Sequence, residues 1–115
     1  MAEALYGNLT AAPELRFTSN GNAIATLRVA VNERVNENGQ WRDGETTYHD
    51  VVVWRQQAEH AADAFSKGDR IVAAGRSKTR TWTKDDGTEG SKTEFVAEEI
   101  GPSLKFKSFA DLVRS

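Results

Sequence analysis

The sequence predicts an all-β fold: a five-stranded Greek-key barrel with one helix between the third and fourth strands. Short segments with alternating apolar residues recur along the chain and are separated by turn sequences. One stretch changes to helical spacing. A length of 115 residues suits a single domain whose core can fold without disulfides or metals. The absence of cysteine excludes thiolate metal sites and cysteine nucleophiles.

The first two predicted strands cover residues 4–9 and 23–34. The second is the clearer, because its odd positions are apolar while polar side chains share the even side: Ala23, Ala25, Leu27, Val29 and Val31 against Thr26, Arg28, Asn32 and Arg34. Pro13 and Asn20-Gly21 supply turn chemistry, so we expect these two strands to form a hairpin. Residues 35–46 contain two Gly-based turn pairs and are predicted to be a long polar loop that carries Trp41.

The third strand and the helix follow each other directly. Residues 46–54 alternate so that Tyr48 and Trp54 share one side and His49 faces the other. From Arg55 to Lys67 the apolar residues take helical spacing, and Gly68 stops the helix: the residues are Ala58, Ala61, Ala62 and Phe65. This narrow, alanine-rich face can lie close against the end of a barrel.

Two more strands complete the order. The fourth covers about residues 69–82, Asp85-Asp86-Gly87 marks a turn, and the fifth covers residues 91–100. Five short strands with a helix between the third and fourth fit a barrel of the oligonucleotide-binding type (OB-fold), whose sheet face and loops hold single strands. An α+β sandwich with a lone helix is the structural alternative.

The charge is unevenly distributed. The net charge is −2, which by itself does not suggest a nucleic-acid partner. Residues 67–84, however, hold six cations and one carboxylate, whereas residues 85–99 hold six carboxylates and one cation. Such a division would let one surface attract phosphate while another keeps the whole particle from being basic.

Cations and aromatic rings alternate on predicted strands. In an extended strand Arg76, Lys78, Arg80 and Trp82 point to one face. Cations along phosphates and flat rings against bases are what a protein needs to bind a single strand without reading its sequence. The candidate stacking residues are Tyr48, Trp54, Trp82 and Trp41, and the candidate phosphate-binding residues are Arg28, Arg34, Arg55, Arg76, Lys78, Arg80 and Lys84. The alternatives are burial of the rings in the core and, for Trp41, a simple loop anchor.

Three segments together resemble the bacterial single-stranded DNA-binding protein family: Tyr6–Asn32, Tyr48–Ala62 and Lys67–Trp82. The similarity extends over residues 4–101, and the ending EEIGPSL (Glu98–Leu104) is similar to actinobacterial members and to phages of those hosts. The resemblance implies base stacking at Tyr48, Trp54 and Trp82. A fourth stacking position, often aromatic, is Val35 here, and Trp41 could substitute for it.

The resemblance also carries expectations about assembly and partners. It implies a homotetramer, with His49 at a subunit contact; a histidine facing the core is the alternative. It divides the chain into a binding domain, residues 1–104, and a short extension, residues 105–115. Members commonly continue into a flexible linker with an acidic tip that recruits replication and repair proteins, and recruitment of this kind is doubtful for a sequence ending in LKFKSFADLVRS.

The predicted function is non-catalytic binding and protection of single-stranded DNA in replication, recombination and repair. No cofactor, metal or membrane is expected, and the expected location is the bacterial cytoplasm, or the host cytoplasm for a phage protein. An enzyme is disfavoured because neighbouring strand residues such as His49 and Asp50 point to opposite faces. A replication-restart or protein-interaction module is the alternative function, and RNA remains open as a ligand.

Overall fold

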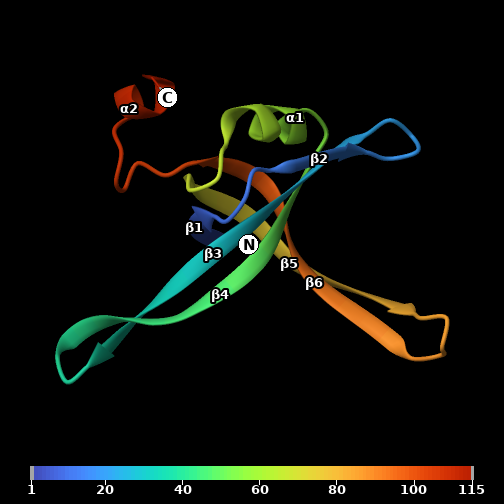
Figure 1. Cartoon of the computed structure of the whole chain (residues 1–115), viewed down its shortest axis with the longest axis horizontal. Helices are drawn as coiled ribbons and strands as arrows, with labels where there is room; N and C mark the ends of the chain where they lie inside the picture. Colours follow the sequence, from blue (N-terminus) through green and yellow to red (C-terminus); the bar gives the residue numbers. More distant parts are fainter. Residues whose placement is uncertain (1, 115) are drawn as a thin grey trace.

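The computed structural model describes the backbone of residues 2–114 and the side chains of this range except at positions 109, 113 and 114. Within it the elements are β1 (Glu3–Leu9), β2 (Glu14–Phe17), β3 (Ala23–Glu37), β4 (Gln40–Trp54), α1 (Arg55–Ala64), β5 (Arg70–Thr83), β6 (Glu89–Pro102) and α2 (Phe109–Arg114). Figure 1 shows the β3–β4 and β5–β6 hairpins leaving the centre of the molecule as two diverging arms.

Five of the strands close a barrel in the order β1-β5-β6-β4-β3, so the predicted OB-fold barrel is confirmed. Two short pairings complete the closure of the barrel. Antiparallel β1 and β3 meet at Asn8↔Ala30 and Leu9↔Val29. Parallel β4 and β6 meet at Val51↔Phe95 and Val52↔Val96.

The structure corrects three sequence expectations. The hairpin at Asn20-Gly21 joins β3 to β2, a short strand outside the barrel that was not predicted, and not to β1. Residues 35–46 are not a loop, because β3 and β4 continue through them to a turn at Asn38 (φ 55) and Gly39 (φ 83). The helix ends at Ala64 instead of Lys67, and α2 follows the barrel. With β2 counted, α1 lies between the fourth and fifth strands.

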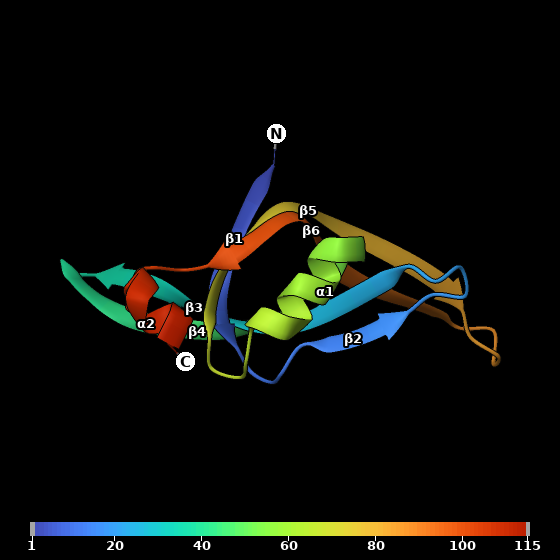
Figure 2. The same ribbon diagram turned by 90° about the horizontal axis from the view of Figure 1, so that it is seen from above.

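The core lies inside the barrel and under α1. Alternation on β3 and β4 turns Leu27, Val29, Val51 and Val53 inward, where each is fully buried. Such side chains each contribute roughly 1.5–3 kcal/mol by leaving water. Helix α1 covers this core (Figure 2) through the predicted alanine face, with Ala58, Ala61 and Phe65 buried.

The side chain of Gln57 ties α1 to an irregularity in β6. The register of β5 against β6 shifts by one residue between Ala74↔Glu99 and Gly75↔Ala97, which leaves Glu98 as an extra residue in β6. The Gln57 amide nitrogen donates to the Glu98 carbonyl at 3.1 Å, and its amide oxygen accepts from the Ile100 N–H at 3.0 Å. The bulge is therefore held by the helix, and it lies within the barrel beside Gly75, where β5 makes its last pair with β1.

No helix in the described part of the chain is long and apolar enough to cross a membrane.

Candidate nucleic-acid interface

The outer face of β3 and β4 carries two exposed rings. Because Leu27 and Val51 point inward, the even-numbered residues point outward, and Tyr48 and Trp54 are 55% and 43% exposed. Neither ring is buried in the core. Arg28 lies beside Tyr48, with its guanidinium carbon 5.3 Å from the ring centroid. This is a cation–π distance, and the interaction favours placing both side chains over the sheet.

The β5–β6 arm continues the same chemistry. The side chains of Arg76, Lys78, Arg80 and Trp82 are exposed, and Trp82 keeps 43% of its surface accessible. The Arg80 guanidinium carbon lies 5.6 Å from the Trp82 ring centroid. The predicted alternation of cations ending in an indole is therefore present on one strand of the arm.

Gly90 lies opposite Trp82 in the ladder and is buried beneath its ring. A Cβ atom at position 90 would lie 2.6 Å from the indole carbon Cε2. The indole thus packs flat across the β6 backbone, and only glycine leaves room for it.

A groove of about 390 Å³ lies where side chains of β2, β3, β4, β5 and β6 converge. It brings together two predicted cations, Arg28 and Arg80, with two that the sequence analysis missed, Arg16 and Lys92. Arg16 was missed because β2 was not predicted. Alternation on the fifth predicted strand places Lys92 and Glu94 on one side, and this could have revealed Lys92.

Two carboxylates lie between these cations. Asp50 contacts Arg28 Nη1 through Oδ1 at 3.2 Å and Lys92 Nζ through Oδ2 at 2.8 Å. Glu94 contacts Arg80 Nε at 3.4 Å and Lys92 Nζ at 3.9 Å. The hydrogen bond from Lys92 lowers the pKa of the Asp50 carboxyl; partial burial opposes this, and the charges of Lys92 and Arg28 reinforce it. Asp50 is therefore ionised at neutral pH.

The pairing of β5 with β6 also changes the interpretation of the charge distribution. The basic segment and the acidic segment lie side by side in one ribbon, with Lys78 opposite Glu94 and Thr83 opposite Glu89. Cross-strand partners share a face, so Glu94 lies on the surface that also holds Lys78 and Arg80. The expected separation of the charges over two surfaces is therefore incomplete on this arm.

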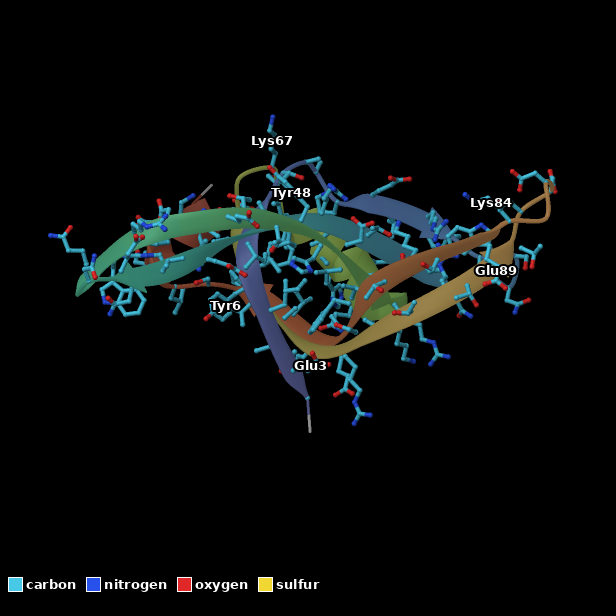
Figure 3. All side chains as sticks on the ribbon, turned by 90° about the horizontal axis from the view of Figure 1, so that it is seen from below. Glu3, Tyr6, Tyr48, Lys67, Lys84 and Glu89 are labelled. Atoms are coloured by element: carbon cyan, nitrogen blue, oxygen red, sulfur yellow. The ribbon has the colours of Figure 1, made fainter. Side chains whose placement is uncertain are left out.

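Of the predicted site residues, only Arg28 and Arg80 line the groove, and the rings of Tyr48 and Trp82 lie beside them. Trp41, 62% exposed, is near the end of the β3–β4 arm, and Lys84 follows β5 at the tip of the other arm (Figure 3). Arg34 lines a different cavity and pairs with Asp43 at 3.8 Å. Arg55 begins α1 with a positive φ of 61°.

His49 lies on the other side of β4, exposed and not in the core. Its Nε2 is 3.0 Å from Thr47 Oγ1. It lines a cavity of about 800 Å³ that also includes Tyr6, Arg70 and Phe106. Arg70 lies over both of those rings, 5.7 and 5.3 Å from their centroids. Nowhere in residues 2–114 do three described acidic or histidine side chains gather into a metal site.

The comparison with known proteins decides the family. A model described as the single-strand binding protein family matches residues 3–103. The chain belongs to this family. The resemblance found in the sequence is thereby confirmed, including its actinobacterial character, because relatives named single-stranded DNA-binding protein come from Corynebacterium glutamicum and Mycobacterium tuberculosis.

The Corynebacterium protein is 44% identical over 113 residues, which is 96% of this chain and 50% of that protein. The Mycobacterium protein (strain H37Rv) is 39% identical over 104 residues, or 89% of this chain and 63% of that protein. This member of the single-strand binding protein family therefore spans between half and two thirds of the length of these relatives.

Two solved structures have the same fold as this family member. The small single-stranded DNA-binding protein from Streptomyces coelicolor matches with a TM-score of 0.73 and 30% identity, covering 90% of this chain and 94% of that one. A deletion mutant of the single-stranded DNA binding protein from Thermus aquaticus matches with a TM-score of 0.77 and 35% identity, covering 91% and 51%.

Proposed function

We propose that this chain binds single-stranded DNA without catalysing a reaction on it. The observation that carries this is the combination of exposed rings at Tyr48, Trp54 and Trp82 with the cation-lined groove. Bases stack on such rings regardless of sequence, while Arg and Lys contact the phosphates. Paired bases hide their faces, so single strands are preferred. Binding of this kind would protect exposed strands during replication, recombination and repair in the bacterial cytoplasm.

The phosphate contacts are assigned to exposed cations on the outer faces of the two arms. Arg76 and Lys78 have no carboxylate partner within ion-pair distance among the described side chains. They can therefore bind phosphate without breaking an existing ion pair. Arg28 and Arg80 lie beside the rings, where a base and its phosphate can be contacted together. Arg55, Lys84, Arg34 and Trp41 would contact a strand only along a path that continues beyond the groove.

We also propose a homotetramer. His49, Tyr6 and Phe106 line a broad cavity on the side of the molecule away from the proposed stacking rings, and Tyr6 and Phe106 are 54% and 72% exposed. Exposed aromatic side chains of this kind are typical of surfaces that contact another protein. A second copy there would leave the groove open.

Titration with oligo(dT) tests the binding proposal. Stacking should quench tryptophan fluorescence as single strands are added, and duplex DNA of equal length should bind far more weakly. Affinity should fall as salt rises, because released counterions contribute to binding. Light scattering on the same samples reports the number of subunits. Absence of quenching and of binding at low salt would contradict the proposal and favour a protein-interaction module.

Gly90→Ala is expected to weaken binding while leaving the barrel intact. The added methyl group would overlap the Trp82 indole in its present position, so the ring must rotate away from the β6 backbone. The loss should approach that of Trp82→Ala, about 1–3 kcal/mol. Gly101→Ala is the matched control, since a Cβ at position 101 meets no heavy atom within 4 Å. Equal oligo(dT) affinity for both variants would show that the packing of Trp82 against Gly90 does not matter for binding.

A further inference from the structure

The ion pairs in the groove form one continuous chain. It runs Arg28–Asp50–Lys92–Glu94–Arg80 and crosses from β3 through β4 and β6 to β5. Three cations thus share two carboxylates. Each member of the chain lines the same groove.

The two carboxylates lie deeper than the cations they pair with. The side chains of Asp50 and Glu94 are 14% and 19% exposed, whereas those of Arg28, Lys92 and Arg80 are 55%, 42% and 63% exposed. An incoming phosphate would therefore meet the cations first, with a fixed negative charge immediately beneath them. A third carboxylate, Glu14, also lines this groove, so its four cations face three acidic side chains.

This arrangement changes what the cations can contribute to binding a polyanion. When Lys and Arg side chains neutralise phosphates, binding draws its salt-dependent free energy from release of the ions condensed on the strand. A cation already neutralised by a carboxylate attracts phosphate less, because the carboxylate repels the same phosphate at short range. Carboxylates beneath the cations should therefore weaken binding and flatten its dependence on salt.

We propose that Asp50 and Glu94 are internal counterions of the groove, which hold Arg28, Lys92 and Arg80 in place and limit the affinity and salt dependence of single-strand binding. The inference rests on the proposed function. It assigns to these two residues a regulatory role on affinity. Stacking holds the DNA strand, while the carboxylates weaken the attraction between the cations and phosphate so that the DNA can be released. Arg76 and Lys78 keep their full attraction for phosphate.

The test uses Asp50→Asn and Glu94→Gln, which remove charge and keep shape. Asp63→Asn on α1 is the matched control, since it makes the same change of net charge on an exposed residue outside the groove. Affinity for oligo(dT) is measured by tryptophan quenching over a series of salt concentrations. Thermal unfolding monitored by circular dichroism verifies that each variant is folded.

We expect Asp50→Asn to bind about two- to tenfold more tightly at low salt, the range corresponding to one or two exposed ion pairs. The slope of log affinity against log salt should steepen by up to about 0.7 for each cation that becomes free to contact phosphate. Glu94→Gln should act in the same direction through Arg80 and Lys92 without removing the Asp50–Arg28 pair. Asp63→Asn should stay within about twofold of the original protein.

Weaker binding by both groove variants would overturn the proposal, because it would mean that the carboxylates only position the cations. Unchanged affinity and slope would overturn it as well. If Asp63→Asn raised the affinity for oligo(dT) as much as the groove variants do, the change in net charge would explain the effect, and a special role for the groove would be rejected. A failure of the unsubstituted protein to bind oligo(dT) is a separate result, which rejects the proposed function itself.

Discussion

Replacing both Trp54 and Trp82 with alanine is expected to weaken oligo(dT) binding by about 2–6 kcal/mol, since each base–ring stack is worth about 1–3 kcal/mol. Both indoles are 43% exposed, and neither belongs to the buried core cluster. The two rings come from different β-strands, β4 and β5, and in the proposed function both would stack against bases of one DNA strand. Losses of this size exceed what any single exposed ion pair in the groove contributes.

Trp41→Ala is the comparison for this double variant. It removes the same kind of ring, more exposed at 62% against 43%, from the end of the β3–β4 arm. Its loss of affinity should be smaller than that of Trp54→Ala or of Trp82→Ala. The measurement is fluorescence anisotropy of labelled oligo(dT), which does not depend on the tryptophans. Unchanged affinity in the folded double variant would remove both rings from the site.

The sequence predicted the barrel because strand alternation and helical spacing depend on local patterns of apolar residues. Leu27 alternates with the polar residues Thr26 and Arg28, and its burial follows the alternation directly. The outward direction of Tyr48 and Trp54 follows from the same period of two. The rings and the basic strand were therefore accessible to sequence reasoning, although their contact with DNA remains a prediction.

Other features depend on partners distant in the chain. β2 has no buried residue of its own, and the alternation of Leu15 and Phe17 with Glu14 and Arg16 covers only four residues, too few to distinguish a strand from a loop. Asp43-Gly44 resembles a turn, yet Gly44 lies within β4, near a register shift, where a Cβ would lie 2.7 Å from Val35 Cγ2. The Asp50–Lys92 pair joins residues whose strands meet only in the closed barrel. Composition alone could not reveal that acidic and basic segments share one groove.

Gly75→Ala is expected to destabilise the fold by about 1–3 kcal/mol or more, the usual range for inserting a methyl group where no space exists. Gly75 follows the register shift between β5 and β6. A Cβ there would overlap the Val96 carbonyl oxygen and lie 2.9 Å from Ala97 Cα. These are backbone atoms, which cannot rotate away as a side chain can, so β5 and β6 must separate.

Gly101→Ala again provides the control, since it adds the same methyl group to the same pair of strands, where no heavy atom lies within 4 Å. Urea denaturation followed by tryptophan fluorescence compares the two, and equal midpoints would contradict the steric explanation. The bulge at Glu98 is anchored by Gln57 and lies within the barrel, shortly before β5 and β6 continue into the arm. Any Gly75→Ala protein that stays folded should therefore also redirect Arg80 and Trp82, and lose oligo(dT) affinity that Gly101→Ala retains.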